Sequence, residues 1–239
     1  MGVSMKLTAP VYILMQRAKD LKRAQSITMV EALNQIAKSE GFLSWSLLQS
    51  KAKTIVPRSR EEILDYLNPG DLVLIGARPG LGKTTLTLQI MLQAAKADRL
   101  CLFFSFEYTD NDIRPKLTAL AGPDTYEEHL RLDFSDDISA DYIIKETKDL
   151  IKEGSLIAMD YLQLLDQKRS NPALQQQIEV LKEYAKATRC ILIFISQIDR
   201  KFTQHDRSRP TLEDVRLPNP LDLRLFNKAI FVEGEQIFI

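Results

Sequence analysis

The chain has 239 residues, a formal net charge of zero and 45% hydrophobic residues. This length allows one ordinary α/β domain with a small appendage, and the apolar content is sufficient for a core. The balanced charge excludes a global field that attracts nucleic acid or membranes, so any such partner must be held by local patches. No run of 18 apolar residues and no signal-peptide core occurs, and we therefore expect a cytoplasmic protein without membrane contact.

Residues 1–57 are predicted to form a small helical module. Apolar spacing favours a helix over about residues 10–24, a Thr28–Glu31 capping box opens a second helix that ends near Gly41, and a third helix follows Ser44. The module holds eight Lys and Arg residues against three Asp and Glu residues. Contact with DNA and docking through a solvated basic face are both open functions for it.

Residues 58–239 are predicted to form one α/β domain. A second capping box, Ser59–Glu62, opens a short helix that ends at a turn over residues 68–70. Strands are expected at residues 71–76, 100–106, 155–160, 190–196 and 228–232, and helices at about residues 83–97, 110–121, 139–152 and 172–188. Alternation of this kind, with almost continuously apolar strands, favours a parallel sheet covered by helices on both faces.

A glycine-rich turn joins the first of these strands to its helix. The turn and the start of the helix comprise Ala77, Arg78, Pro79, Gly80, Leu81, Gly82, Lys83, Thr84 and Thr85. In this layout backbone N–H groups and the helix N-terminus face the β-phosphate of a nucleotide, Lys83 neutralises the β- and γ-phosphate oxygens, and Thr84 holds Mg²⁺. One residue departs from the usual pattern, because Ala77 occupies the place of the first glycine and a glycine stands one position earlier, at Gly76. We predict a site for a nucleoside triphosphate and Mg²⁺.

Three further strands end in polar residues. Asp160 ends the apolar run 156–160, at the place where a P-loop protein holds Mg²⁺ through water. Glu107 ends a second strand and can position or deprotonate an attacking water. Gln197 ends a third, and its amide can donate a hydrogen bond to a γ-phosphate. For each of the three, an ordinary surface or loop role is the alternative.

Five segments, in this order, resemble the RecA-like motor domain of DnaB-type replicative helicases. They are Gly-Ala-Arg-Pro-Gly-Leu-Gly-Lys-Thr (76–84), Phe-Phe-Ser-Phe-Glu (103–107), Asp-Tyr-Leu-Gln-Leu-Leu (160–165), Ile-Ser-Gln-Ile-Asp-Arg (195–200) and Arg-Pro-Thr-Leu-Glu-Asp-Val-Arg (209–216). The resemblance covers residues 68–233 and implies a P-loop NTPase whose strand with Gln197 lies between the strands that carry the glycine-rich turn and Asp160.

The same resemblance implies roles for individual residues. ATP is the nucleotide, Lys83 binds its phosphates, Glu107 is the catalytic base and Gln197 senses the γ-phosphate. Thr84 and Asp160 hold Mg²⁺. The family also implies a homo-oligomer, a ring or a filament with ATP between subunits, or a helicase partner.

In that family, loops after two central strands grip single-stranded DNA. The matching stretches here are residues 166–171 and 199–209, which carry three acidic residues. Their basic residues are Lys168, Arg169, Arg200, Lys201, Arg207 and Arg209. A net charge of +3 over two loops is modest, so contact with single-stranded DNA and simple solvation are both open.

Two features depart from the family pattern. An arginine finger, in a Lys-x-Arg motif, is expected on a strand beyond residues 229–232, and the sequence up to Ile239 holds none. Slow ATP hydrolysis follows, unless a partner or one of Arg209, Arg216 and Arg224 supplies the charge. The module 1–57 is also shorter than the family's collar domain and resembles helical modules of plasmid or phage-type proteins.

Two functions therefore compete. One is a DNA-stimulated ATPase, helicase or translocase in DNA replication or in plasmid or phage maintenance, and the retained Glu107 favours it. The other is an ATP-gated binding module that regulates or loads a partner, which the missing finger and the neutral charge favour.

Overall fold

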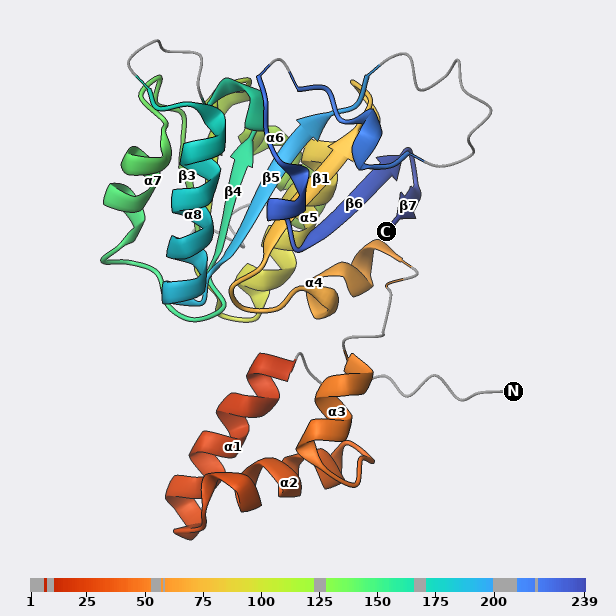
Figure 1. Cartoon of the computed structure of the whole chain (residues 1–239), viewed down its shortest axis with the longest axis vertical. Helices are drawn as coiled ribbons and strands as arrows, with labels where there is room; N and C mark the ends of the chain where they lie inside the picture. Colours follow the sequence, from red (N-terminus) through yellow and green to blue (C-terminus); the bar gives the residue numbers. More distant parts are fainter. Residues whose placement is uncertain are drawn as a thin grey trace. The chain divides into compact units, whose positions relative to one another are not determined.

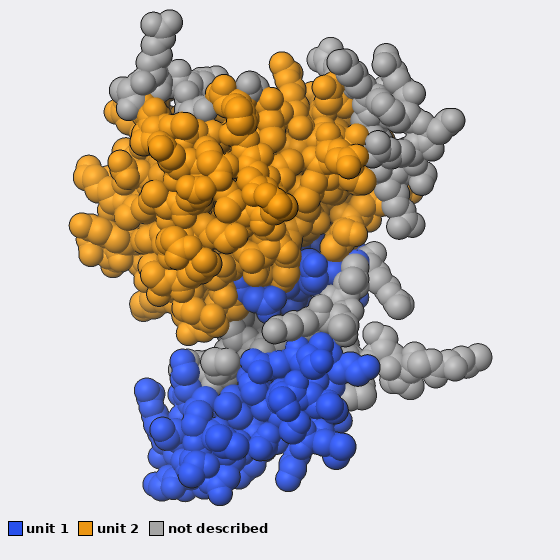
Figure 2. All heavy atoms as spheres, in the orientation of Figure 1, with its two compact units in different colours: residues 1–68 blue, residues 69–239 orange. Residues whose placement is uncertain are grey.

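The computed structural model describes residues 7, 11–52, 57, 59–122, 128–165, 171–199, 210–217 and 219–239. These residues form two compact units, residues 1–68 and 69–239, which are coloured separately in Figure 2. The domain boundary expected after residue 57 stays a prediction. In the described part of the chain, no helix is long and apolar enough to cross a membrane.

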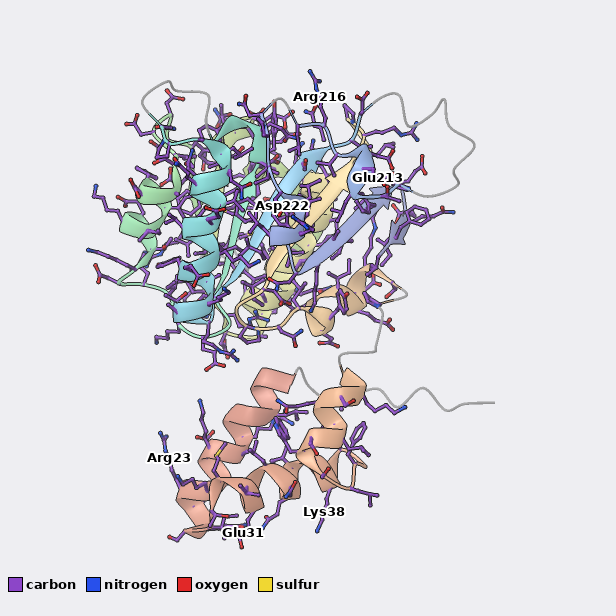
Figure 3. The ribbon with its side chains drawn as sticks, in the orientation of Figure 1. Arg23, Glu31, Lys38, Glu213, Arg216 and Asp222 are labelled. Atoms are coloured by element: carbon purple, nitrogen blue, oxygen red, sulfur yellow. The ribbon has the colours of Figure 1, made fainter. Side chains whose placement is uncertain are left out.

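The first unit contains the three predicted helices, α1 (Val11–Gln25), α2 (Met29–Ser39) and α3 (Trp45–Ala52) (Figure 1). The capping box of α2 forms as predicted, since the Thr28 N–H donates to Glu31 Oε2 at 2.8 Å and the Glu31 N–H donates to Thr28 Oγ1 at 3.2 Å. A small core holds the helices together and consists of Leu14, Ala37, Phe42, Trp45 and Leu48. The charged side chains of Arg23, Glu31 and Lys38 point away from these helices (Figure 3).

A 3-10 turn, η1 (Arg60–Glu62), and the short helix α4 (Ile63–Tyr66) follow. The second predicted capping box is wrong. The Ser59 side chain makes no bond to the backbone of η1 and instead hydrogen-bonds Glu61, which lowers the pKa of that carboxyl. The 3-10 turn does not by itself prevent a capping box, because η4 (Leu212–Asp214) forms one between Thr211 and Asp214. At η1 the Ser59 side chain is instead engaged by Glu61.

The second unit is built on a seven-stranded sheet with the order β3-β2-β4-β5-β1-β6-β7. The strands are β1 (Leu72–Ala77), β2 (Cys101–Ser105), β3 (Leu130–Asp133), β4 (Leu156–Asp160), β5 (Ile191–Gln197), β6 (Lys228–Glu233) and β7 (Gln236–Phe238). All neighbouring pairs are parallel except β6 and β7, which are antiparallel. The predicted α/β fold and the central place of β5 are confirmed, while the two edge strands β3 and β7 were not predicted.

Helices cover both faces of this sheet. α7 (Ala140–Thr147) and α8 (Leu174–Thr188) lie on one face, and α5 (Lys83–Lys96) and α6 (Asp110–Ala121) lie on the other (Figure 1). Strands β1, β2 and β4 are buried along their whole length, which explains their almost continuous apolar sequence. The helix predicted over residues 139–152 is shorter than expected, because the chain leaves α7 after Thr147 and turns at Gly154, where φ is +84°.

The displaced glycine of the turn has a packing role. Gly76 lies opposite Phe231 of β6, and a Cβ atom at position 76 would be 2.8 Å from two ring carbons of Phe231. The turn itself places its positive φ angles at Gly80 (+77°) and Gly82 (+91°). Ala77 ends β1 with no positive φ angle, so this position needs no glycine.

We predict that Gly76→Ala lowers the free energy of unfolding by about 1–3 kcal/mol, because the added methyl group overlaps the Phe231 ring. Urea unfolding of the purified protein measures this change. In a Phe231→Leu background the same substitution should cost less, since the ring atoms that it meets are gone. An equal cost in both backgrounds would show that the overlap is not the cause.

Candidate functional site

The parallel register brings the ends of four strands to one edge of the sheet. Asp160 at the end of β4 lies opposite Ser105 of β2 and Ile195 of β5, and Ala77 at the end of β1 lies opposite Gln197 of β5. The glycine-rich turn leaves β1 at this edge and leads directly into α5. In open parallel sheets, ligands bind outside this carboxyl edge.

Four of the residues predicted from the sequence lie together there. Lys83, the first residue of α5, is 5% exposed, and its Nζ atom is 3.8 Å from Glu107 Oε2. The next residue, Thr84, donates its hydroxyl hydrogen to Asp160 Oδ2 at 2.8 Å. The turn, its lysine, its hydroxyl and two strand-end carboxylates thus form one continuous cluster.

Asp160 is the most deeply buried group of this cluster, with no exposed surface. Its second oxygen, Oδ1, is also buried and has no hydrogen-bond partner among the described residues. Burial raises the pKa of the Asp160 carboxyl to about 6, although the Thr84 bond and the Lys83 ammonium oppose the rise. The negative charge is therefore poorly satisfied by the protein alone.

The oxygen atoms of Thr84 and Asp160 suit Mg²⁺, which prefers hard oxygen ligands. The buried Asp160 Oδ1 supplies an acceptor that the described protein groups leave unused. No group of three His, Cys, Asp or Glu side chains suited to a metal occurs within the described ranges. Mg²⁺ usually takes one or two carboxylates together with water and substrate phosphates.

Two tyrosines that sequence reasoning missed also line this cluster. The Tyr108 hydroxyl forms a hydrogen bond with the Thr84 side chain, and burial together with the Glu107 charge raises the pKa of both Tyr108 and Tyr161. Ser105 Oγ accepts the backbone N–H groups of Glu107 at 3.2 Å and Tyr108 at 3.0 Å, which fixes the exit of β2. Tyr108 directly follows Glu107 in the sequence, and Tyr161 directly follows Asp160. This adjacency to two predicted site carboxylates is the sequence signal that could have identified both tyrosines.

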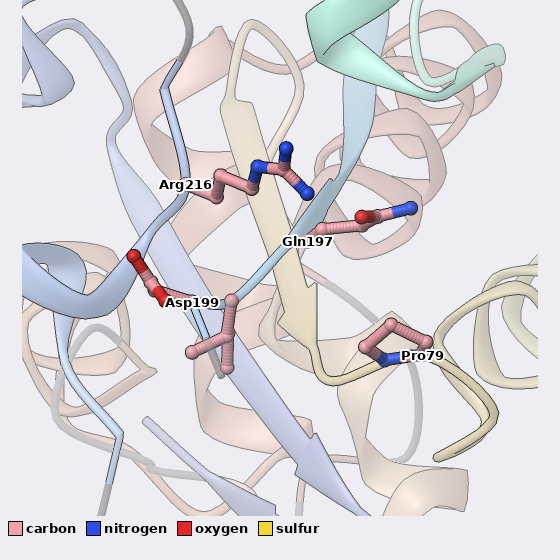
Figure 4. Close-up of a pocket in the computed structure, with 5 residues that line it drawn as sticks. Pro79, Gln197, Asp199 and Arg216 are labelled. Carbon is pink, nitrogen blue, oxygen red and sulfur yellow. The ribbon is translucent and has the colours of Figure 1, made fainter. Parts of the chain in front are cut away.

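The remaining predicted residues lie around this cluster or outside the described part. Arg78 of the turn pairs with Glu233 at the end of β6. Pro79 and Gln197 line a neighbouring hollow of about 490 Å³ together with Ile198, Asp199 and Arg216. In Figure 4 the Arg216 guanidinium points towards Gln197, whereas the Asp199 carboxylate points away from both.

The arginines and lysines proposed as a substitute finger or as DNA contacts lie outside this cluster or outside the described residues. Arg224, one of the three candidate fingers, donates from Nε to Asp222 Oδ1 at 2.9 Å. The candidates for DNA contact all lie outside the described residues, and they are Lys168, Arg169, Arg200, Lys201, Arg207 and Arg209.

Comparison with known proteins gives one consistent picture. The family model of the DnaB-like helicase C terminal domain matches residues 59–123 and 119–219. The replicative DNA helicase DnaB of Mycoplasma genitalium is 30% identical in an alignment of length 191 that covers 65% of this chain and 41% of that protein. The DnaB helicase of Helicobacter pylori strain J99 is 28% identical in an alignment of length 180 that covers 62% of this chain and 37% of that protein. The chain thus matches about two fifths of the length of these relatives.

Solved structures show the same fold. A DnaB-like replicative helicase, solved in a study of its interactions with primase, has a TM-score of 0.58 at 21% identity, covering 92% of this chain and 67% of that one. A solved ATPase domain has a TM-score of 0.57 at 21% identity and covers 78% of this chain and 79% of that one.

The buried carboxylate predicts a pH-dependent stability in the absence of nucleotide and Mg²⁺. Because the pKa of Asp160 rises from 3.8 to about 6 on folding, the native state binds the proton more tightly than the unfolded state. The wild type should therefore lose stability relative to Asp160→Asn as the pH rises from about 4 to about 6, by about 1–3 kcal/mol in total. Urea unfolding of both proteins across this pH range measures the difference. A difference that is constant with pH would contradict the raised pKa.

Proposed function

Because the chain belongs to the family of DnaB-like helicase C-terminal domains, we propose that it binds ATP with Mg²⁺ and hydrolyses it in response to single-stranded DNA. The observation that supports this most directly is the cluster at the carboxyl edge of the sheet, where Lys83 lies 3.8 Å from Glu107 and Thr84 bonds Asp160. The cluster combines a phosphate-binding turn, a cation, a position for a metal and a candidate base within one site.

Phosphate binding in this proposal falls to the turn and to Lys83. The backbone N–H groups that the turn offers, those of its residues other than Pro79, and the N-terminus of α5 would face the phosphates, and the Lys83 ammonium would neutralise their charge. The triphosphate carries more negative charge than the Glu107 carboxylate, so it competes successfully for Lys83 Nζ. Binding of ATP then leaves Glu107 available to a water molecule.

Hydrolysis in this proposal uses Glu107 and the strand ends. The Glu107 side chain is about one-third exposed, so it can accept a proton from an attacking water or orient that water towards the γ-phosphate. Thr84 and Asp160 would hold Mg²⁺, which supplies positive charge against the phosphate oxygens. Gln197 ends β5, the strand next to that of Asp160, and is proposed to sense the γ-phosphate.

Membership in a family of DnaB-like helicase domains supports two further parts of the proposal. One is the stimulation of hydrolysis by single-stranded DNA, and the other is assembly as a homo-oligomer or with a helicase partner.

We predict that binding and hydrolysis separate on substitution. Lys83→Ala should abolish ATP binding because it removes the charge that neutralises the phosphates. Glu107→Gln should bind ATP and turn it over at least about 100-fold more slowly, which is the usual size of a base contribution. Fluorescent-nucleotide titration and steady-state phosphate release measure the two effects.

Lys96→Ala is the matched control, because Lys96 lies at the exposed last turn of the same helix and should leave both quantities unchanged. Wild-type turnover in Glu107→Gln would remove Glu107 from the catalytic role. Tight ATP binding by the wild type with turnover that single-stranded DNA never accelerates would instead indicate an ATP-gated binding module.

A further prediction concerns the basic loops. Changing Lys168, Arg169, Arg200 and Lys201 to alanine should weaken single-stranded DNA binding and flatten its salt dependence, because each lost phosphate contact lowers the slope of log K against log salt by about 0.7. Fluorescence anisotropy at several salt concentrations measures the slope.

The control removes the same charge from the helical module by changing Lys19, Lys22, Arg23 and Lys38 to alanine. We expect its slope to equal that of the wild type. An unchanged slope in the loop variant and a reduced slope in the module variant would place the DNA contact on the helical module instead.

A further inference from the structure

Gln163 joins three segments that approach the nucleotide site from different parts of the chain. It lies in the 3-10 turn η2 (Leu162–Leu164), three residues after Asp160, and is 7% exposed. Its Nε2 atom donates to Ser196 Oγ at 2.8 Å and to the Arg216 carbonyl oxygen at 2.5 Å. Ser196 is fully buried and directly precedes Gln197.

The segment that carries Arg216 is held to the end of β5 by backbone bonds as well. The Arg216 N–H donates to the Gln197 carbonyl at 2.8 Å, and the Asp199 N–H donates to the Asp214 carbonyl at 2.8 Å. Between these bonds, Ile198 and Val215 form an antiparallel bridge. The backbone of Arg216 is thus held on both sides. Its N–H is bonded to Gln197, the proposed γ-phosphate sensor, and its C=O is bonded to Gln163.

The same network reaches the glycine-rich turn. The Ile198 N–H donates to the carbonyl oxygen of Ala77, the residue from which the turn begins. A displacement of the turn, of the Asp160 strand end or of Gln197 therefore acts on the backbone that aims the Arg216 guanidinium into the hollow of Figure 4. Buried hydrogen bonds of this kind are costly to break singly, so the segments move together.

We infer that Gln163 is a positioning residue that couples the state of the nucleotide site to the Arg216 segment. The inference rests on the proposed function, because it assumes that nucleotide occupies the turn. Gln163 itself contacts no phosphate in this role. It acts through the backbone of Arg216 and the hydroxyl of Ser196.

Gln163→Met tests the coupling, because methionine has a similar length and cannot donate the two hydrogen bonds. Gln177→Met is the matched control. Gln177 is 1% exposed, accepts the Ala140 N–H at 2.9 Å and donates to the Leu165 and Pro172 carbonyls at 3.0 and 2.8 Å, so it loses comparable buried bonds away from Arg216.

The measurement is amide hydrogen exchange with and without Mg²⁺ and a non-hydrolysable ATP analogue. In the wild type, nucleotide should slow exchange in residues 78–85. Through the coupling it should also slow exchange at Asp199 and Arg216 by about fivefold, because their existing hydrogen bonds open less often by roughly the net contribution of one such bond. Gln163→Met should retain the protection of residues 78–85 and lose the nucleotide-dependent change at Arg216. Gln177→Met should retain both.

The possible results separate the inference from the proposed function. Absence of protection at residues 78–85 in the wild type would overturn the proposed function, and the inference with it. Protection there without a change at Arg216, or the same change at Arg216 in Gln163→Met, would overturn the inference alone. If Gln163→Met does not fold, Ser196→Ala removes one of the two acceptors with a smaller change of side-chain volume. It should reduce the protection at Arg216 at least twofold, and an unchanged value would overturn the coupling.

Discussion

Burial of the Asp160 carboxylate sets the conditions under which the rest of the site works. One oxygen accepts the Thr84 hydroxyl, and the other is buried without a hydrogen-bond partner among the described residues. A carboxylate in such surroundings carries a desolvation cost that one hydroxyl does not offset. In the proposed function, a cation beside Thr84 would remove that cost, and the triphosphate that accompanies it would meet Lys83 and the turn at the same edge. Metal and phosphate binding are therefore expected to reinforce one another.

The sheet makes this arrangement rigid. Because β5 lies between β1 and β4, the ends of the three strands that carry Ala77, Gln197 and Asp160 cannot shift independently. The Phe231 ring closes over Gly76 on the other side of β1, and Arg78 is tied to Glu233 at the end of the same neighbouring strand. The turn thus begins from a strand that is fixed on both sides, while Gly80 and Gly82 supply its conformational freedom.

Much of this architecture is readable from the sequence, because the central strands are continuously apolar and end in a polar residue. The edge strands were missed for a physical reason. β3 has four residues that alternate Leu-Arg-Leu-Asp, and β7 has three, so neither is long enough to give a strand pattern. Lys83, Thr84, Glu107 and Asp160 were each predicted from a local motif, and parallel pairing then brings them together.

The residues that were missed depend on tertiary contacts. Gln163 reaches Arg216 across 53 positions of sequence, and the contact exists only because η2 and the segment before residue 217 both fold against the end of β5. The two capping-box patterns illustrate the same limit, since the motif forms at Thr28 and fails at Ser59, whose side chain bonds Glu61 instead of the turn backbone.

A structure determined with Mg²⁺ and a non-hydrolysable ATP analogue tests the central claim most directly. We expect the metal about 2.1 Å from the Thr84 hydroxyl oxygen, with the Asp160 carboxylate facing it directly or through water. Lys83 Nζ should lie against a phosphate oxygen, no longer beside Glu107. Phosphates bound away from the turn, with Lys83 still paired to Glu107 and Thr84 still bonded to Asp160, would contradict the account.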